Sequence, residues 1–233
     1  MTLKTDLESQ VNDTFMLPWD VQKTNDVPAP VDLRLNANHA KDLETATVLY
    51  ADLDGSTSMV DGQQWQFSAE VYKTFLRCAS QVIRSEGGAI TAYDGDRVMA
   101  IFAGDSKNTS AVRAAMKIHY AVVKIIQPAL DTQYPTSGFQ VSHVVGIDTS
   151  QMKAARIGVH GDNDIVWVGR AANHAAKLTT LSGAQTWITK AVYDNINESV
   201  KKSSNGALMW EARAWSNMNN QTVYRSTWWW SID

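Results

Sequence analysis

The stretch TATVLYADLDGSTS, residues 45–58, joins a short run of strand-forming residues to an aspartate and a glycine turn. Thr47 to Tyr50 are β-branched or bulky residues that favour a half-buried strand, and the turn at Gly55 ends the strand before a helical pattern begins. Asp52 therefore stands at the end of the predicted strand. A carboxylate in that position can meet both solvent and a ligand.

A second stretch, TAYDGDRVMAIF at residues 91–102, holds two strand-forming runs on either side of Asp94, Gly95 and Asp96. Asp-Gly is a strong signal for a tight turn, so we expect a hairpin that raises Asp96 as a second carboxylate. If the hairpin lies beside the first strand, Asp52 and Asp96 converge. Converging carboxylates repel unless a cation lies between them, and oxygen ligands with room for phosphate suit Mg²⁺ or Mn²⁺. The alternative is a pair of ordinary turn aspartates, because Asp and Gly populate turns for local reasons.

The residues that follow the first aspartate suit a phosphate group. Gly55, Ser56 and Thr57 would offer backbone N–H groups at the start of a helix, where anions bind favourably. We therefore expect these three residues to seat a triphosphate beside the carboxylates.

The composition is that of an ordinary soluble protein. The chain has 233 residues and a formal net charge of −3, so it carries no basic field for nucleic acid. Hydrophobic residues make up 44%, and no run approaches the roughly 18 apolar residues of a membrane helix. No secretory signal opens the chain. The single cysteine, Cys78, falls in a helical apolar pattern and cannot form an internal disulfide, so we expect a small buried residue in a cytoplasmic protein.

The chain divides into an irregular arm at residues 1–44 and one domain at residues 45–233. The arm holds three of the five prolines and shows no sustained period. It also carries four apolar residues that a solvated tail would not favour: Phe15, Met16, Leu17 and Trp19. We expect the arm to pack on the domain or on a second subunit.

The domain begins with the element order βαββαβ. Apolar residues recur at helical spacing over residues 64–86 and 111–125, and Pro128 is expected to stop the second helix. Residues 139–147 are again strand-forming. The simplest packing of this order is an antiparallel sheet with both helices on one face, the split-βαβ arrangement of ferredoxin-like and palm-like α+β folds.

Additional strands and helices follow this core. They are a β-rich stretch at 153–168 with a turn at 161–163, helices at 169–181 and 190–196, a strand at 186–188 and a β-prone end at 208–230. The end contains Trp228, Trp229 and Trp230. Such a cluster is more typical of packing or of an interface than of chemistry.

A third motif lies in GRAANHAAKL, residues 169–178. Asn173 and Lys177 stand four apart among alanines, on one helical face, and could present an amide and a positive charge to one ligand. Taken alone, the motif is more typical of a surface helix whose polar residues are solvated. Its position after the other two motifs changes that interpretation.

The three blocks DLDGST, GDRVMAIF and GRAANHAAKL together resemble the class III nucleotidyl cyclase catalytic domain. The resemblance implies that Asp52 and Asp96 bind two divalent metals, Mn²⁺ or Mg²⁺, and that the carbonyl of Leu53 is a further ligand. It also implies that Asn173 orients the ribose. Lys177 falls where the family usually has an arginine that steadies the transition-state phosphate.

The residue types suit cyclisation, an in-line attack of the ribose 3′-oxygen on the α-phosphorus with pyrophosphate leaving. Positioned charge is the main requirement. Lys177 keeps a point charge but lacks the forked donor of arginine. Arg170 and Arg97 are alternative phosphate cations, although Arg97, one step along the strand from Asp96, should point to the other face of the hairpin.

The residues expected at the base favour a pyrimidine. Purine cyclases of this family place polar residues four before the second metal aspartate and three before the motif glycine, where this chain has Ala92 and Val166. An apolar pair cannot read a purine edge by hydrogen bonding. Tyr50, two residues before Asp52, is a bulky residue that could shorten the base pocket. Alternatively, it only packs in the core of the sheet. The chain thus looks most like the Pycsar anti-phage pyrimidine cyclases, which make cyclic UMP or cyclic CMP for a co-encoded effector.

The resulting hypothesis is a homodimeric cyclase that converts UTP to 3′,5′-cyclic UMP, with metals bound by one subunit and Asn173 and Lys177 supplied by the other. UTP is preferred over CTP because Arg97 can only donate a hydrogen bond, which favours a uracil carbonyl over a cytosine amine. The product would act on a separate cyclic-nucleotide-responsive effector in bacterial anti-phage defence. Three alternatives stay open: a cytidylate cyclase, a purine cyclase, and a degenerate nucleotide-binding module without turnover.

Overall fold

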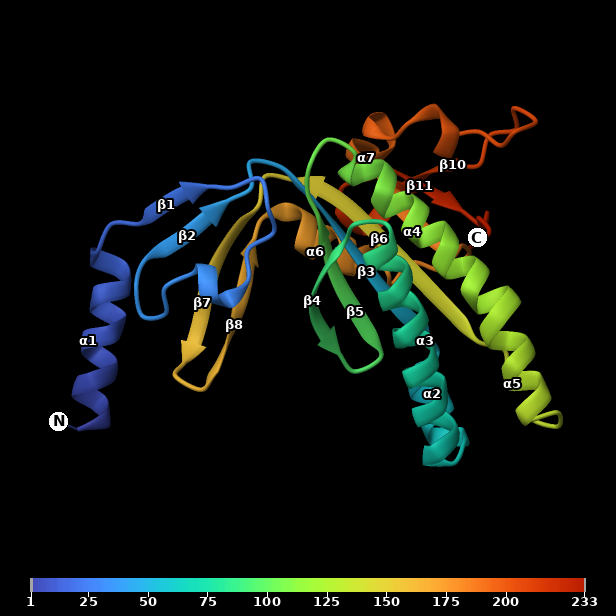
Figure 1. Ribbon diagram of the computed structural model, residues 1–233, viewed down its shortest axis with the longest axis horizontal. Coiled ribbons are helices and arrows are strands. Elements are labelled where there is room, and N and C mark those ends of the chain that lie inside the picture. Colours follow the sequence, from blue (N-terminus) through green and yellow to red (C-terminus); the bar gives the residue numbers. More distant parts are fainter. Residues whose placement is uncertain (1, 233) are drawn as a thin grey trace.

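The computed structural model describes residues 2–232, which form a larger sheet packed with helices and a smaller sheet beside it (Figure 1). The strands are β1 (Asp20–Lys23), β2 (His39–Asp42), β3 (Ala46–Asp54), β4 (Ala89–Asp94), β5 (Arg97–Phe102), β6 (Ser142–Ser150), β7 (Lys153–Val159), β8 (Asp162–Val168), β9 (Thr186–Thr189), β10 (Glu211–Trp215) and β11 (Gln221–Ser226). The α-helices are α1 (Leu3–Met16), α2 (Ser56–Gly62), α3 (Trp65–Ser85), α4 (Lys107–Ala121), α5 (Gln127–Gln133), α6 (Arg170–Leu178) and α7 (Lys190–Asn195).

The larger sheet has seven strands in the order β10-β11-β9-β6-β3-β5-β4. β3 lies between β5 and β6 and is antiparallel to both, while β6 and β9 are parallel. The predicted hairpin, β4–β5, therefore lies beside the predicted first strand. The α+β class expected from the sequence is confirmed.

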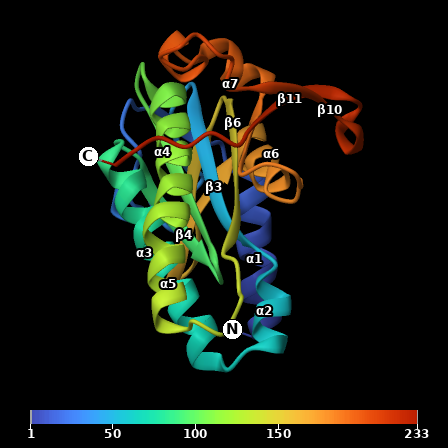
Figure 2. The same cartoon turned by 90° about the vertical axis from the view of Figure 1, so that its right-hand side faces the viewer.

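Side-chain alternation along β3 divides the core between the two faces of this sheet. Leu49 and Leu53 pack with α3 and α4 on one face, and Val48 and Tyr50 pack toward α6 on the other. Figure 2 shows α3 and α4 on one side of β3 and β6, with α6 on the opposite side. The two helices of the predicted βαββαβ core thus cover one face, as expected. Asp52, two residues after Tyr50, belongs to the α6 face.

Helix α6 lies close against the larger sheet at Gly146 of β6. A Cβ atom on Gly146 would lie 2.2 Å from the carbonyl oxygen of Ala175 and 2.8 Å from Cβ of Leu178. Gly146 is paired with Tyr50 of β3. The missing side chain therefore lets α6 lie directly against the strands that carry the candidate site.

The N-terminal segment is not irregular, contrary to the sequence-based expectation. It contains α1, β1 and β2, and the small sheet has the order β1-β2-β7-β8. Backbone pairing with β7 orders this segment, and such pairing leaves no periodic signal in the segment itself. Four apolar residues of this segment are exposed, so they do not pack on the domain, and their packing on a second subunit stays a prediction: Phe15, Met16, Leu17 and Trp19. The domain boundary at residue 44 stays a prediction.

Pro128 does not stop the second predicted helix. α4 continues through a π-turn at Val122–Ile126 into α5, where Pro128 lies in the first turn. The N–H of Gln127 donates to the carbonyl of Val122, five residues earlier. This wider turn accommodates a residue that has no N–H to donate.

The C-terminal tryptophans pack against α4 and the π-turn. The N–H of Trp230 donates to the carbonyl of Met116 at 3.2 Å. The rings of Trp229 and Tyr120 have centroids 5.4 Å apart, and the ammonium of Lys124 lies 5.4 Å from the Trp229 ring. Trp229 and Trp230 therefore take part in packing, one of the two roles expected from the sequence, while Trp228 and Trp229 stay partly exposed.

Two expectations from composition concern the cysteine and the membrane. Cys78 is a free cysteine on α3 and is half-buried. None of the helices within residues 2–232 combines the length and the apolar character needed to cross a bilayer.

Candidate active site

Asp52 lies near the end of β3 on the α6 face of the larger sheet. Backbone pairing places it opposite Arg97 of β5 and Val144 of β6. The hydroxyl of Thr179, the residue that follows α6, lies 3.4 Å from Oδ2 of Asp52. Two strands and the end of a helix thus enclose the carboxylate and leave it partly buried.

Asp96 lies in the turn between β4 and β5, next to the residue that pairs with Asp52. Its Oδ2 is buried and has no hydrogen-bond partner among the described residues. Burial, and after it the negative charge of Asp96, raises the pKa of Asp52 to about 6, although Arg97 acts in the opposite direction. The two predicted carboxylates therefore converge closely enough to repel each other.

A divalent cation suits this pair. It would reduce the repulsion between the Asp52 and Asp96 carboxylates, and it would give the buried Oδ2 of Asp96 a partner. Within residues 2–232, no group of three or more His, Cys, Asp and Glu side chains could hold a metal by itself. A metal at this point would take Asp52, Asp96 and the carbonyl of Leu53 from the protein. Phosphate oxygens and water would complete its coordination, as is common for Mg²⁺.

The segment after β3 forms the start of α2. Gly55 adopts a left-handed conformation with a φ angle of 74°, and the helix begins at Ser56 without a side-chain cap. Backbone N–H groups of an uncapped first turn have no partner within the helix. The structure thus places Gly55, Ser56 and Thr57 directly beyond the carboxylate strand, and their contact with phosphate stays a prediction.

Tyr50 and Arg97 lie on the same face of the sheet as Asp52. The guanidinium carbon of Arg97 lies 5.4 Å from the centre of the Tyr50 ring, and its Nη2 donates to Asp94 at 2.6 Å. The sequence-based expectation that Arg97 points to the other face is therefore wrong. Asp96 lies in the turn, where the alternation of side chains along a strand no longer applies. Arg97 pairs with Asp52 across the two strands, so its side chain points to the same face as that of Asp52.

Ala92 and Val166 do not meet within the chain. Ala92 of β4 is half-buried and packs, like Tyr50, against the apolar cluster beneath α6. On β8, Ile165 and Trp167 pack toward that cluster, so Val166 between them faces the opposite side of the smaller sheet. Only Ala92 of the predicted pair therefore lies near Tyr50 in the same chain.

Asn173 and Lys177 lie on the exposed face of α6. The Nζ atom of Lys177 lies 3.8 Å from Sδ of Met218, in the turn between β10 and β11. That hairpin forms one edge of the larger sheet, whereas Asp96 lies at the β4–β5 edge. Asn173 stands six residues before Thr179, about 9 Å along the helix axis. The exposed face of α6 that carries Asn173 and Lys177 is thus turned away from its own sheet, and the Lys177 side chain extends toward the β10–β11 hairpin.

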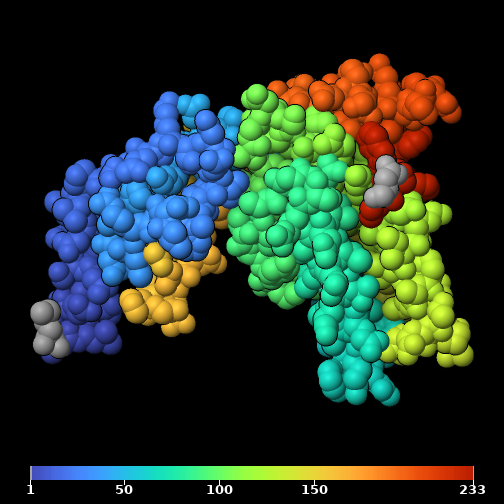
Figure 3. Space-filling model, viewed as in Figure 1, coloured from blue at the N-terminus to red at the C-terminus, as the bar shows by residue number. Residues whose placement is uncertain are grey.

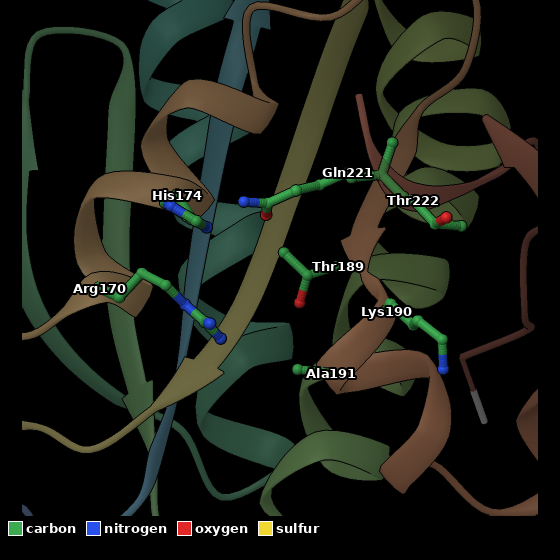
Figure 4. Close-up of a pocket in the computed structure, with 8 residues that line it drawn as sticks. Arg170, His174, Thr189, Lys190, Ala191, Gln221 and Thr222 are labelled. Carbon is green, nitrogen blue, oxygen red and sulfur yellow. The ribbon is translucent and has the colours of Figure 1, made fainter. Parts of the chain in front are cut away.

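Arg170, whose side chain is half-exposed, pairs with a buried carboxylate that the sequence did not reveal. Its Nε and Nη2 lie 3.2 and 3.4 Å from the carboxylate of Asp148, which is fully buried on β6. The hydroxyl of Thr189 donates to the same carboxylate at 2.5 Å. Arg170, Thr189 and His174 line a pocket of about 240 Å³ (Figure 4). No local pattern marks Asp148, because its partners come from distant segments.

Comparison with known proteins places this fold in a family, although no protein-family model matches the chain. The chain is 60% identical to a uridylate cyclase from Burkholderia cepacia and 50% identical to one from Xanthomonas perforans, with 100% of both chains covered in each case. A uridylate cyclase from Rhodovulum sp. (strain MB263) is 37% identical, with 98% of each chain covered. The chain belongs to the uridylate cyclase family.

As a member of the uridylate cyclase family, the chain is a nucleotidyl cyclase, which confirms the resemblance drawn from the three motifs. Solved structures agree at the level of the fold. The adenylyl cyclase CyaB from P. aeruginosa is 19% identical with a TM-score of 0.64, covering 83% of this chain and 96% of that one. A bacterial light-regulated adenylyl cyclase is 15% identical with a TM-score of 0.70, covering 88% and 56% respectively.

Proposed function

We propose that this chain converts UTP to 3′,5′-cyclic UMP and pyrophosphate, at two sites shared by a homodimer and each using two divalent metals. The observation that carries the proposal is the convergence of Asp52 and Asp96 in a chain that is 60% identical over its full length to a uridylate cyclase. Cyclisation depends on charge held in position, and a carboxylate pair at the end of a strand is where metal-bound phosphate can be held.

Asp52 and Asp96 hold Mn²⁺ or Mg²⁺ in this proposal, with the carbonyl of Leu53 as a further ligand. The bound metals supply positive charge that favours ionisation of the ribose 3′-hydroxyl and neutralises the departing pyrophosphate. The buried, unpaired Oδ2 of Asp96 supports this role.

The remaining groups orient the nucleotide. The N–H groups of Gly55, Ser56 and Thr57 bind the triphosphate at the start of α2. Asn173 orients the ribose, and Lys177 places its positive charge beside the α-phosphate as negative charge builds up there. Lys177 is a better candidate for this role than Arg170, whose guanidinium is already paired with Asp148.

Asn173 and Lys177 come from the second subunit in this proposal, because both side chains are exposed and the ammonium of Lys177 lies beside Met218 in the β10–β11 turn. Figure 3 shows a hollow between the smaller sheet, on the left, and the helices of the larger sheet, on the right. A second copy of the chain entering this hollow would bring α6 to the carboxylates. Val166, on the outward face of the smaller sheet, would likewise reach a base only in a neighbouring subunit.

The base contacts combine stacking surface with hydrogen-bond donors. Tyr50 and Ala92 supply an apolar wall without donors or acceptors aimed at a purine edge. Arg97 lies over Tyr50 and carries donors only, which match the O4 carbonyl of uracil better than the N4 amine of cytosine. These groups support UTP as the substrate and CTP as the nearest competitor.

An assay with each of the four nucleoside triphosphates and Mn²⁺, read out by mass spectrometry, tests the reaction. We expect cyclic UMP as the main product, no turnover after metal removal, and no turnover by well-folded Asp52→Ala or Asp96→Ala. Cyclic CMP as the main product would make the chain a cytidylate cyclase. Cyclic AMP or cyclic GMP as the main product would overturn the base assignment, and binding without any product would indicate a degenerate module.

Mixing two inactive variants tests whether the sites are shared. Asp52→Ala removes a carboxylate from one half of each site, and Asn173→Ala removes the amide from the other half. A heterodimer of the two variants contains one complete site, so activity should return after subunit exchange. If exchange is verified by mass and activity stays absent, each site lies within one chain.

The biological role that we propose follows from the resemblance to Pycsar cyclases. Cyclic UMP would activate a separate cyclic-nucleotide-responsive effector during phage infection. Cells carrying the cyclase and its neighbouring effector gene should resist phage, and the Asp96→Ala variant should remove this resistance. If cells with the Asp96→Ala variant resist phage as well as cells with the wild type, cyclase activity is not required for the resistance.

A further inference from the structure

A buried network behind α6 joins the helix to the larger sheet. The carboxylate of Asp148, on β6, accepts hydrogen bonds from the hydroxyl of Thr189 at 2.5 Å and from Nε and Nη2 of Arg170 at 3.2 and 3.4 Å. Nδ1 of His174 lies 3.4 Å from the same carboxylate, and Arg170 also donates to the carbonyl of Thr149 at 2.9 Å. The middle strand β6, the end of β9 and the first turns of α6 thus meet at one carboxylate.

Arg170 is the cation that balances Asp148. The side chain of Asp148 is 0% exposed, and a buried carboxylate without a counter-charge is strongly destabilising. His174 does not replace Arg170, because burial lowers the pKa of its imidazole more than Asp148 raises it, and the ring is neutral near pH 7. Arg170 is therefore held at the start of α6 by a charge that cannot reach solvent.

Packing alone does not secure this flank of α6. A pocket of about 240 Å³ lies beside the network, between Arg170 and His174 on one side and Gln221 and Thr222 on the other. Figure 4 shows the side chain of Arg170 directed into the same space as Thr189, with Gln221 directed toward His174. The His174 ring packs edge-on against Trp215, with ring centroids 5.4 Å apart, whereas open space lies beside Arg170. The polar contacts to Asp148 therefore contribute more to the position of the first turn of the helix, where apolar contacts are fewer.

We propose that Asp148 is a positioning residue for cyclisation, acting through Arg170 and Thr189 on the placement of α6 and hence of Asn173 and Lys177. The proposal rests on the proposed function, in which Asn173 and Lys177 act on the nucleotide held by a partner chain. Asp148 itself does not touch the nucleotide. A displacement of about 1 Å in such groups can lower a rate about a hundredfold, so a modest release of the helix is sufficient.

The experiment places Asp148→Asn on either chain of the heterodimer of Asp52→Ala and Asn173→Ala. The complete site of that heterodimer uses α6 of the Asp52→Ala chain and the carboxylates of the Asn173→Ala chain. With Asp148→Asn on the Asp52→Ala chain, we expect kcat to fall about tenfold or more with little change in KM. With Asp148→Asn on the Asn173→Ala chain, its α6 serves a site that is already inactive, and we expect activity within about twofold of the parent heterodimer.

The matched control is Glu86→Gln, which also removes a buried carboxylate, one that pairs with Arg113 and Lys117 on the other face of the sheet. Glu86→Gln should change activity equally whether it is placed on the Asp52→Ala chain or on the Asn173→Ala chain. If Asp148→Asn also lowers activity equally in both arrangements, or in neither, the positioning role is wrong. Arg170→Gln, at a half-exposed side chain, breaks the same contacts and takes the place of Asp148→Asn if that variant does not fold.

If the sites are not shared between subunits, the parent heterodimer of Asp52→Ala and Asn173→Ala shows no activity, and this outcome is distinct from a failure of the role proposed for Asp148. In that case a double-mutant cycle in the homodimer decides the matter. If Asp148 acts through Asn173, then Asp148→Asn should lower the residual rate of Asn173→Ala by much less than it lowers the wild-type rate. Equal losses in the two backgrounds would overturn the proposal.

Discussion

Asp52, the proposed metal ligand on β3, lowers the stability of the metal-free protein near neutral pH. Burial and the charge of Asp96 raise its pKa to about 6, from an ordinary value of 3.8. The folded protein therefore binds this proton more tightly than the unfolded chain does. The stability that this proton contributes is present at low pH and is lost as the pH rises from about 4 through 6.

Asp52→Asn should therefore stabilise the metal-free protein at about pH 7.5, by about 1–2 kcal/mol after allowance for partial exposure. Chemical denaturation at several pH values measures the effect, which should shrink as the pH is lowered toward about 4. Mn²⁺ should stabilise the wild type and not the variant. Asp61→Asn, at an exposed position on α2, is the control and should change little. If the metal-free variant is less stable than the wild type at about pH 7.5, the ionised carboxylate of Asp52 does not destabilise the folded protein.

Tyr50 and Arg97 are, at the same scale, the residues that we propose select the base. Tyr50→Ala removes the ring over which Arg97 lies and enlarges the space beside Ala92. We expect the ratio of purine to pyrimidine product to rise more than total cyclisation falls, because the carboxylates and phosphate contacts remain. Competition among the four triphosphates measures this ratio. Tyr120→Ala, beside Trp229, is the control, and an unchanged ratio in Tyr50→Ala would remove Tyr50 from base selection.

At the scale of elements, the contact between α6 and β6 places the helix that carries Asn173 and Lys177 next to β3, the strand of Asp52. Gly146→Ala would place a Cβ 2.2 Å from the carbonyl oxygen of Ala175, so the helix must move outward. Overpacking of this kind costs about 1–3 kcal/mol. We expect kcat to fall further than the loss of stability explains, because Asn173 and Lys177 move with the helix.

Thermal melts and steady-state kinetics at a temperature where the variant is folded separate these two effects. Gly62→Ala is the matched control, because its Cβ would meet no atom within 4 Å and its backbone conformation needs no glycine. Wild-type kcat in folded Gly146→Ala would show that the placement of α6 does not limit the reaction.

At the scale of the whole molecule, α1 is a helix that its own chain leaves uncovered. None of its 14 residues is buried, and Leu3, Leu7 and Val11 follow one another at helical spacing. An isolated helix of this length is marginal in water. Because the proposed active sites need a second copy of the chain, we expect that copy to cover the apolar face of α1.

Leu7→Glu combined with Val11→Glu should raise the dissociation constant of the dimer by about tenfold or more, since each apolar side chain contributes about 1.5–3 kcal/mol when fully buried. Sedimentation or light scattering across a dilution series measures this constant, and specific activity should fall with the dimer. Glu8→Gln, at an exposed position on the same helix, is the control. An unchanged dissociation constant would show that α1 lies outside the dimer interface.

The sequence by itself determined the candidate groups for the chemistry and the local elements that hold them. Asp52 ends a strand, Asp96 lies in a hairpin turn, and Asn173 and Lys177 share a helical face, because each feature depends on neighbours within a few residues. The order of these motifs was also sufficient to predict the α+β fold and the nucleotidyl cyclase family.

Only the tertiary structure decided which of these groups meet. The direction of Arg97 depends on pairing between β3 and β5, and the separation of Lys177 from Asp96 depends on strand order in the larger sheet. The contacts of Asp148 come from partners on β9 and α6 that no local pattern connects to it. The ordered N-terminal strands likewise depend on pairing with β7. Such contacts join residues far apart in the chain, and their energies depend on burial and register, which exist only once the chain has folded.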